Sequence, residues 1–452
     1  MAINLRQNST SPNIGNSNLV HAVTSNSSSQ AQFKFVADIN DANGDLLQRI
    51  KQQPNPNTTG VFDFGNIIPT YLGPTDEVWK IANVTQNTAC GKDFQIRFGE
   101  EYASTVTGFT SLYTGDTPDA AGNPNVSGSD YIFLIDGVTN PNDLVNWNWN
   151  SGSKYNEEDP LDDVTFTHQN GLTYFNTSSV RIGDYHTISF LNGNLGGEGT
   201  LDVNSAQDVF AVIYRQYDAT GSLLDTDTLF NTAAGPRTLQ TQFWSDVYTT
   251  QDETTRLIHW PAGPQNIEDA GVPILLDDTG YYTMTFYAQA TDTFANQDGV
   301  WGEYRFDIDN KNCGYDGVRF AWKNEYGVWD YFNMGLAEST TSTIERESYE
   351  QSFVDYSATN TVTYSKDRRG QSQFQNRINK VRTAQSDYLN QTDADNLREL
   401  FFSTNVYVQD GTEFLPVVIE NASVREKTNP RSQKLFTYTV NYRYANEERP
   451  RV

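Results

Sequence analysis

The sequence predicts a mainly β protein made of several β-sandwich domains followed by a small C-terminal α+β module. Aromatic residues make up 13% of the 452-residue chain and charged residues only 19%, with abundant Asn, Thr, Ser and Gly. Aromatic and β-branched side chains fit the half-buried surface of a strand better than that of a helix. A single core stops growing near about 250 to 300 residues, so this length calls for more than one domain.

The first predicted segment is a flexible arm over residues 1–29. This stretch is polar and rich in Asn and Ser. It lacks a basic start followed by an apolar run, so it does not resemble a secretory signal. No apolar run elsewhere reaches the length that crosses a bilayer. We therefore expect a soluble protein made in a cytoplasm and not inserted into a membrane.

Two segments, 30–105 and 207–337, are each predicted to form a β-sandwich of immunoglobulin- or fibronectin-like type. Residues 33–40 alternate between apolar and polar and end in Asp-Ala-Asn-Gly at 41–44. An apolar run at 210–214 leads to Asp-Ala-Thr-Gly at 218–221. Such a turn after a strand-like segment predicts a hairpin. The likeness of the two turns indicates either a repeated domain or a turn sequence that is simply common.

The segment between the sandwiches, 106–206, is a loop-rich insertion or a domain of its own. It contains Trp147 and Trp149, whose spacing places both rings on one side of a strand. Such a pair can stack on a sugar ring, but it more often fills a core or a subunit contact. The same segment has a cluster of carboxylates that suits either a calcium ion or a solvated acidic loop, the second being favoured. The cluster consists of Glu157, Glu158, Asp159, Asp162 and Asp163.

Residues 338–376, rich in Ser, Thr and Gln, are predicted to be a linking segment, either a crossing segment or an extended strand, that leads to the α+β module 377–452. Its helix should begin at Thr392 as the cap, with Asp395 in the capping-box position. Leu397, Leu400 and Phe401 then fall on one face. Strict alternation over 436–444 predicts a final strand.

Charge is unevenly distributed along the chain. Residues 366–452 hold 14 Lys and Arg against 11 Asp and Glu, whereas residues 1–365 hold 17 against 46. A formal charge of −26 argues against nucleic-acid binding. A mildly basic module can dock on the acidic surface of a neighbour, although loop composition alone could also cause the difference. The predicted docking residues are Lys366, Arg368, Arg369, Arg377, Lys380 and Arg382.

Motifs for catalysis or for cofactor and metal binding are not found in the sequence. Four histidines form no triad or His-Glu-x-x-His pattern, and no phosphate-binding glycine loop is present. Cys90 and Cys313 are the two cysteines and are expected to be buried thiols. We therefore expect a protein that is not an enzyme and that binds neither cofactor nor metal.

Two stretches resemble virion structural proteins of tailed bacteriophages, including those of crAss-like phages. One contains FKFVADIN and PNPNTTGVFDFGNIIPTYL within 33–72. The other begins with RFAWKNEYGVWDYFNM and continues through SDYL, LRELFFSTNVYVQDGTEFLPVVI and FTYTVNYRYANEE. The resemblance covers about a third of the chain.

The resemblance implies a subunit present in many identical copies in the virion, in the tail, neck or collar, often as a ring and without enzymatic activity. Its partners would be copies of itself and other virion proteins. Trp147 and Trp149 motivate an alternative, a carbohydrate-binding host-adhesion module of a tail fibre or spike that binds a glycan receptor. A secreted polysaccharide-degrading enzyme is the third and least favoured hypothesis.

Overall fold

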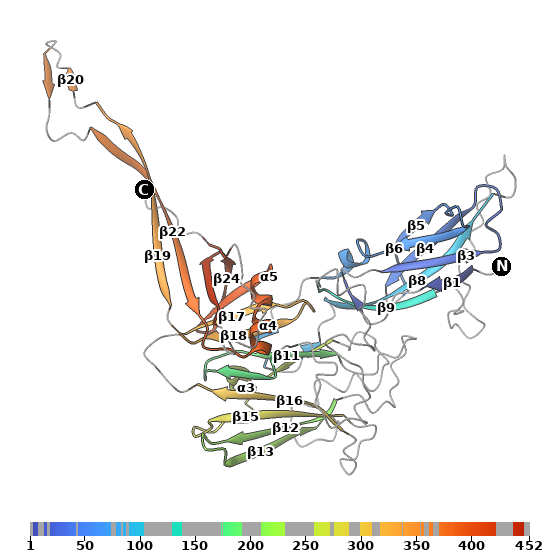
Figure 1. Cartoon of the computed structure of the whole chain (residues 1–452), viewed down its shortest axis with the longest axis horizontal. Helices are drawn as coiled ribbons and strands as arrows, with labels where there is room; N and C mark the ends of the chain where they lie inside the picture. Colours follow the sequence, from blue (N-terminus) through green and yellow to red (C-terminus); the bar gives the residue numbers. More distant parts are fainter. Residues whose placement is uncertain are drawn as a thin grey trace. The chain divides into compact units, whose positions relative to one another are not determined.

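The computed structural model shows a mainly β chain that divides into two compact units (Figure 1). Unit 1 comprises Met1–Asn310 and Lys323–Asp330, and unit 2 comprises Lys311–Trp322 and Tyr331–Val452. The predicted fold class is confirmed. The structure describes residues 3–7, 13–15, 19–41, 44–73, 78–82, 85–86, 90–103, 129–137, 173, 175–191, 209–230, 257–271, 275–288, 299–309, 317–336, 338–352, 354–356, 361–364, 370–421 and 437–446.

The first sandwich of unit 1 packs a three-stranded sheet on a five-stranded one. The small sheet has the order β1-β3-β6, and the large sheet has the order β2-β9-β8-β4-β5. One core cluster unites residues from both, including Val23, Phe62 and Phe94. The strands are β1 (Ile3–Gln7), β2 (Asn13–Ile14), β3 (Val20–Ser25), β4 (Lys34–Asp41), β5 (Leu46–Gln52), β6 (Thr59–Asp63), β8 (Gly91–Glu101) and β9 (Ser129–Ile135).

The second sandwich has the same construction. Its large sheet has the order β10-β16-β15-β12-β13, and its small sheet has the order β11-β14-β7. Ile188 and Trp260 of the small sheet share one core cluster with Tyr282 of the large sheet. The strands are β7 (Thr85–Gln86), β10 (Thr177–Val180), β11 (Thr187–Leu191), β12 (Val209–Tyr217), β13 (Leu223–Phe230), β14 (Leu257–Pro261), β15 (Tyr281–Ala288) and β16 (Gly299–Ile308).

The two large sheets have identical topology. In each, a short first strand pairs in parallel with the last strand, β2 with β9 and β10 with β16. The other neighbours pair antiparallel. This strand order matches the variable-type immunoglobulin sandwich. In that type, extra strands are added to the sheet that contains the last strand. The topology supports a repeated domain over the alternative of a common turn.

Matching hairpin turns confirm the correspondence at the level of single bonds. Asp41 Oδ1 accepts from the Asp45 amide at 2.8 Å, and Asp218 Oδ1 accepts from the Ser222 amide at 2.8 Å. Both turns end in a glycine with positive φ, 84° at Gly44 and 90° at Gly221. A β-bulge follows each turn, with Leu47 of β5 and Leu224 of β13 as the extra residues.

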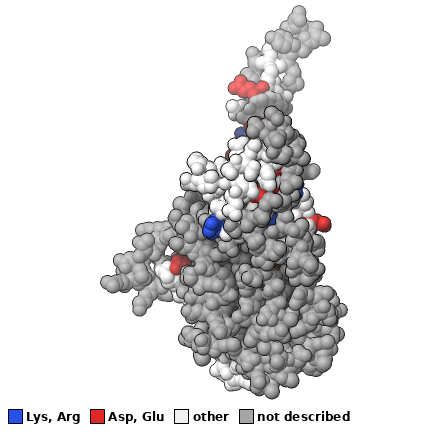
Figure 2. All heavy atoms as spheres, turned by 90° about the vertical axis from the view of Figure 1, so that its right-hand side faces the viewer, with Lys and Arg blue, Asp and Glu red and all other residues white. Residues whose placement is uncertain are grey.

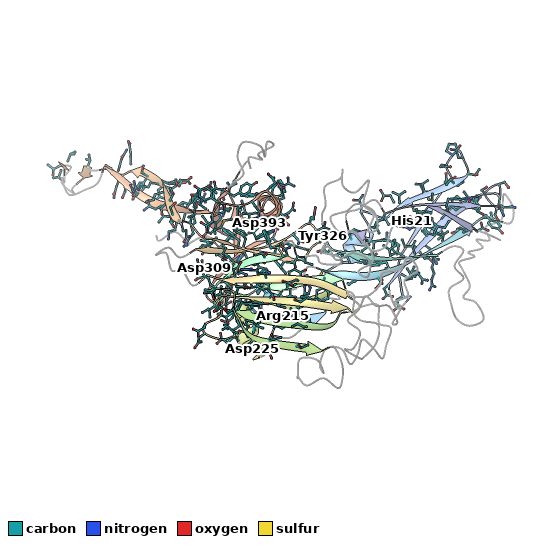
Figure 3. All side chains as sticks on the ribbon, turned by 60° about the horizontal axis from the view of Figure 1, so that its bottom comes forward. His21, Arg215, Asp225, Asp309, Tyr326 and Asp393 are labelled. Atoms are coloured by element: carbon teal, nitrogen blue, oxygen red, sulfur yellow. The ribbon has the colours of Figure 1, made fainter. Side chains whose placement is uncertain are left out.

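The first sandwich also corrects one expectation, because residues 1–29 include three of its strands, β1, β2 and β3, instead of forming a flexible arm. Leu19, His21 and Val23 are fully buried, and His21 lies 5.3 Å from the Phe64 ring in the interior (Figure 3). Alternation over these few positions gives one face that packs into the core despite the polar composition around it. The first sandwich also extends beyond the expected boundary at residue 105, because its strand β9 lies at Ser129–Ile135.

Several polar groups inside the second sandwich form specific hydrogen bonds. The Trp260 indole donates to the Tyr214 hydroxyl at 2.8 Å, and Tyr282 donates to the Ala262 carbonyl at 2.6 Å. Burial raises the pKa of Tyr214 well above its usual value. The buried Asn266 side chain accepts from the His186 amide and donates to the Trp79 carbonyl, both at 2.7 Å. It thereby ties helix α3 (Pro264–Ala270) to the 3-10 turn η2 (Val78–Lys80).

Unit 2 is built on a seven-stranded antiparallel sheet with the order β18-β17-β23-β24-β25-β22-β19. The helices α4 (Gln391–Leu397) and α5 (Glu399–Phe402) contribute Leu397 and Leu400 to its interior. The sheet strands are β17 (Val318–Lys323), β18 (Trp329–Met334), β19 (Ser339–Glu350), β22 (Gln371–Gln385), β23 (Val406–Asp410), β24 (Glu413–Ile419) and β25 (Thr439–Tyr444).

The start of the predicted helix is corrected by two residues. Asn390 is the N-cap, and its side chain accepts from the Asp393 amide at 2.8 Å. Thr392 therefore lies inside the first turn. Asn and Thr are both good caps, so composition alone could not choose between them.

The repeated turn generates a stability prediction. Replacing Gly221 by Ala should lower the free energy of unfolding by about 1 kcal/mol, because its positive φ is strained for a residue with a Cβ. Gly44→Ala should behave alike, as measured by urea titration. Gly183→Ala is the control, since its Cβ would meet no atom within 4 Å. Equal stability of all three variants would contradict the assigned turn conformation.

Candidate functional site

A long two-stranded ribbon is the most distinctive surface feature of unit 2. β19 and β22 pair antiparallel from Ser339–Thr383 to Glu350–Gln371. Figure 1 shows them running out of the sheet, with β20 (Val354–Tyr356) near the far end, where β21 (Val362–Tyr364) pairs with it. All twelve residues of β19 are exposed. We call β19 and β22 together the ribbon.

The sequence forms a ribbon here because β19 is rich in Thr and Ser, and its partner is rich in Gln and Asn. Polar strands of this kind form backbone hydrogen bonds with each other, but neither has a continuous apolar face to bury. A two-stranded hairpin without further cover is at best marginally stable in water. The residues predicted to be a linking segment therefore include a strand that depends on other surfaces for stability.

One side of the ribbon, here called the basic face, combines an aliphatic pair with cations. Ile344 and Ile378 stand directly opposite each other and are 46% and 37% exposed. Arg346 follows on β19 and Lys380 on β22, each two residues from an isoleucine and hence on the same face. The pair is thus flanked by positive charge on both sides.

The opposite side of the ribbon has a different character. Tyr349 and Phe374 are about half exposed, and their ring centroids lie 6.2 Å apart. Phe374 is the extra residue of a β-bulge in β22. Nearer the sheet, Glu345 lies opposite Arg377, so this side has no excess of cations. Both sides of the ribbon therefore expose large apolar side chains.

The root of the ribbon is held by a polar cluster. Arg382 lies 3.2 Å from the Glu338 carboxylate and 4.7 Å from the centre of the Tyr444 ring. Tyr442 donates to the same Glu338 carboxylate at 2.9 Å, and burial raises the pKa of this tyrosine. These bonds fix the direction in which the ribbon leaves the sheet.

The predicted docking residues divide into three groups. Lys380 is on the basic face, whereas Arg377 is on the opposite side and Arg382 is engaged at the root. Lys366, Arg368 and Arg369 lie outside the described residues. The structure thus does not gather the described basic residues into one patch. Figure 2 likewise shows the described charges of that view scattered, with both signs present.

The other sequence candidates cannot be placed. Trp147 and Trp149 lie outside the described residues, as do the carboxylates between Glu157 and Asp163 and the second cysteine, Cys313. Cys90 is buried and is not in a disulfide, as predicted. Within the described ranges, no group of three or more His, Cys, Asp and Glu side chains could hold a metal. The same ranges hold no helix with the length and hydropathy of a membrane span.

Edge strands of the two sandwiches carry charges that oppose pairing with another chain. On β13, Asp225 and Asp227 stand opposite Gln216 and Tyr214, two residues whose side chains are buried. Both carboxylates consequently point toward the core side of a sheet edge (Figure 3 labels Asp225). On β5, Arg49 is paired with Asp38 at 2.6 Å. Inward-pointing charges and charged edges are common protection against edge-to-edge association.

A serine and a histidine meet inside the second sandwich, at a place where hydrolytic chemistry is not supported. Ser189 Oγ lies 2.7 Å from His259 Nδ1, and both residues are fully buried. Burial lowers the pKa of His259 from 6.5 to about 3. A general base must take up a proton near the working pH and reach its substrate, and this imidazole does neither. The contact is a core hydrogen bond.

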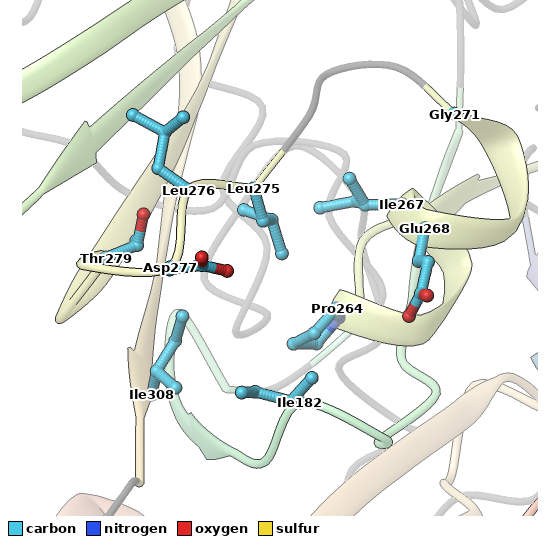
Figure 4. A pocket seen from close by; sticks show the side chains of 10 residues that line it. All are labelled: Ile182, Pro264, Ile267, Glu268, Gly271, Leu275, Leu276, Asp277, Thr279 and Ile308. Atoms are coloured by element: carbon cyan, nitrogen blue, oxygen red, sulfur yellow. The ribbon is translucent and has the colours of Figure 1, made fainter.

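A pocket of about 390 Å³ opens beside helix α3 (Figure 4). Apolar side chains dominate its lining, and Glu268 and Asp277 supply the carboxylates. Thr279, its hydroxyl residue, donates to the Gln216 side chain at 2.8 Å. No nucleophile lies beside a base in this lining, so the pocket suits binding better than catalysis.

Comparisons with known proteins leave the family open. No protein-family model matches the chain, and no curated protein matches it. Among solved structures, the native conformation of E. coli alpha-2-macroglobulin, determined by cryo-electron microscopy, aligns with 97% of this chain at 10% identity and a TM-score of 0.18. The chain corresponds to 22% of that structure's chain. A likeness of this size carries no argument about fold or function.

The pH dependence of stability should report the buried imidazole. Below pH 6.5 the unfolded chain protonates His259, whereas the folded chain does not until about pH 3, so stability falls as the pH drops through this window. The loss amounts to at most about 1.4 kcal/mol per pH unit for this group. In His259→Asn, which keeps a partner for Ser189, urea titrations from pH 7 to pH 4 should show a shallower decline. An unchanged slope would contradict the assignment.

Proposed function

We propose that this chain is a non-enzymatic structural subunit of a tailed-phage virion, oligomeric in the tail, neck or collar, and that it assembles through the ribbon. The resemblance of its N-terminal and C-terminal stretches to virion proteins supports the setting. The exposed ribbon supports the mode of action. It is the single observation on which the proposal rests, because such an element gains most of its stability from a partner.

Exposed apolar side chains on both sides of the ribbon favour insertion between surfaces. Ile344 and Ile378 lie on one side, and Tyr349 and Phe374 on the other. Covering a large apolar side chain contributes about 1.5 to 3 kcal/mol. A ribbon that contacts a neighbour on one side would still expose the other. Contact on both sides links successive subunits, which suits a ring or stack of identical copies.

The outer edge of β19 gives a second reason to expect assembly. β19 is the last strand in its sheet, and no described strand pairs with this edge. Along its twelve residues, the backbone donors and acceptors that point away from β22 are therefore available to another chain. Extended elements that add to such an edge gain affinity from main-chain hydrogen bonds. The charge-protected edges β5 and β13 are poorer acceptors.

Glycan binding, the alternative function, is motivated by a sequence motif and gains no support from the described residues. The pair that motivates it, Trp147 and Trp149, lies outside them. Among the described aromatics, Tyr217 and Tyr281 stack at 4.7 Å, and Arg305 lies 3.9 Å from the centre of the Tyr281 ring. The faces of the Tyr281 ring are thus already in contact with other side chains. These contacts link neighbouring strands and leave no free ring face on Tyr281 for a sugar to stack on.

The setting is tested by cryo-electron microscopy of the phage particle that encodes this chain. We expect several symmetry-related copies in the tail, neck or collar, with density for the ribbon in contact with a neighbour. A complete particle map that accounts for all protein density without this chain would refute the proposed setting.

Self-association of the purified chain should depend on the distal aromatics of the ribbon. Tyr349→Ser combined with Phe374→Ser should weaken it by about tenfold or more, because exposed aromatic pairs are typical binding hot spots. Light scattering across a dilution series measures the change. Leu46→Ser is the control, since Leu46 is 53% exposed on β5, outside the ribbon. Equal effects of the two changes would argue against a specific role for the ribbon.

A further inference from the structure

We propose that the pocket beside α3 is the receiving site for the basic face of the ribbon from a second copy of this chain. This inference rests on the proposed function and adds the location of the partner surface. Ile344 and Ile378 of one copy would enter the pocket of the next. Arg346 and Lys380 would then lie over the two carboxylates of its lining.

The pocket is built by a short helix and a loop that are each fixed in place. α3 begins at Pro264 and ends at Ala270, and its C-cap Gly271 has a left-handed conformation with a φ of 71°. The Gln216 side chain accepts from the Leu276 amide at 2.9 Å and from the Thr279 hydroxyl at 2.8 Å. These bonds hold the loop against β12. The opening between the helix and the loop is therefore a formed feature of the second sandwich.

The lining offers an aliphatic surface to an incoming side chain. Ile267 and Leu275 face each other across the opening in Figure 4, with Ile308 and Ile182 below them. Ile182 is 63% exposed and Leu276 is 41% exposed, so apolar surface continues to the rim. Contiguous exposed apolar surface at a concave site usually marks a binding site.

The charge of the pocket restricts its occupant. Glu268 comes from α3 and Asp277 from the facing loop, and no Lys or Arg is among the lining residues. Neither carboxylate has an ion-pair partner among the residues that the structure describes. An occupant that combines aliphatic groups with cations at two sides would meet both features. An acidic or purely polar ligand would meet neither.

The basic face of the ribbon has this combination. Ile344 and Ile378 form its aliphatic centre, and both are substantially exposed. Arg346 and Lys380 lie on either side of that centre, each displaced by two residues, which is about 7 Å along a strand. Their long side chains can reach the carboxylates while their aliphatic stems cover the rim.

A contact between the ribbon of one copy and the sandwich of the next is heterologous, because the two surfaces differ. Heterologous contacts generate a ring when the rotation closes, and otherwise a filament. Each copy would then use both surfaces, donating its ribbon to one neighbour and its pocket to another. This explains why the two exposed apolar surfaces, one basic and one acidic, occur in the same chain.

Charge reversal in the full-length chain tests the contact. Variant A carries Glu268→Lys and Asp277→Lys, and variant B carries Arg346→Glu and Lys380→Glu. Each alone sets like charges against each other and should weaken self-association about tenfold or more. An equimolar mixture should restore association, since the reversed pocket of A accepts the reversed ribbon of B and the remaining contact is the native one. Sedimentation velocity measures all three samples.

A matched control separates the pocket from general charge effects. Asp225→Lys with Asp227→Lys makes the same change in net charge on the same sandwich, at the edge of β13, and should leave self-association unaltered. Circular dichroism and thermal unfolding establish that each variant is folded. Weakening by this control as great as that by variant A would overturn the pocket contact.

The outcomes distinguish this inference from the proposed function. If the Tyr349→Ser and Phe374→Ser change dissociates the assembly while variant A assembles normally, the pocket is not the receiving site and the role of the ribbon stands. If the mixture of A and B fails to associate, the pairing of these two surfaces is refuted. A wild-type chain that stays monomeric at all concentrations would refute a second copy as the occupant.

Discussion

A two-stranded ribbon cannot bury either of its own faces, and the proposed assembly of this chain follows from that constraint. β19 and β22 join twelve and fifteen residues whose backbone groups are paired with each other but whose side chains are mostly exposed. Their exposed isoleucines and aromatics remain in water unless another surface covers them. Because a hairpin gains little stability from two strands alone, the ribbon depends on contacts outside its sheet.

The two sandwiches of unit 1 are the opposite case. Each closes its own core between two sheets, and their buried polar groups are largely bonded, as at Asn266 and Tyr214. Acidic and basic side chains protect the edges at β13 and β5. One element of unit 1 breaks this pattern, the apolar pocket beside α3 with its two carboxylates. Among the described residues, the chain thus combines two sandwiches that close their own cores with two exposed apolar surfaces, the ribbon and the pocket, whose charges are complementary.

Much of the fold could be predicted from short patterns. Alternation at 33–40, the apolar run at 210–214 and the Asp-to-Gly turns identified β4 and β12, because a strand-like segment that ends in such a turn forms a hairpin. The pairing of β19 with β22 was not predicted, because neither strand has apolar residues at every second position. Such alternation indicates that one face of a strand is buried and does not show which strands pair. Leu19 and Val23 were missed because two buried positions are a weak signal within a polar stretch. The pocket could not be foreseen, as Ile182, Ile267 and Ile308 are brought together only by the fold.

Hydrogen exchange of the ribbon amides tests the central claim most directly. The purified chain would be labelled at concentrations below and above its assembly threshold, and the peptides covering 339–350 and 371–385 would be compared with those of β4 and β12. We expect slow exchange of the ribbon amides only in the assembled sample, with the amides of the sandwich cores protected in both samples. Ribbon amides that exchange equally fast before and after assembly would contradict this expectation.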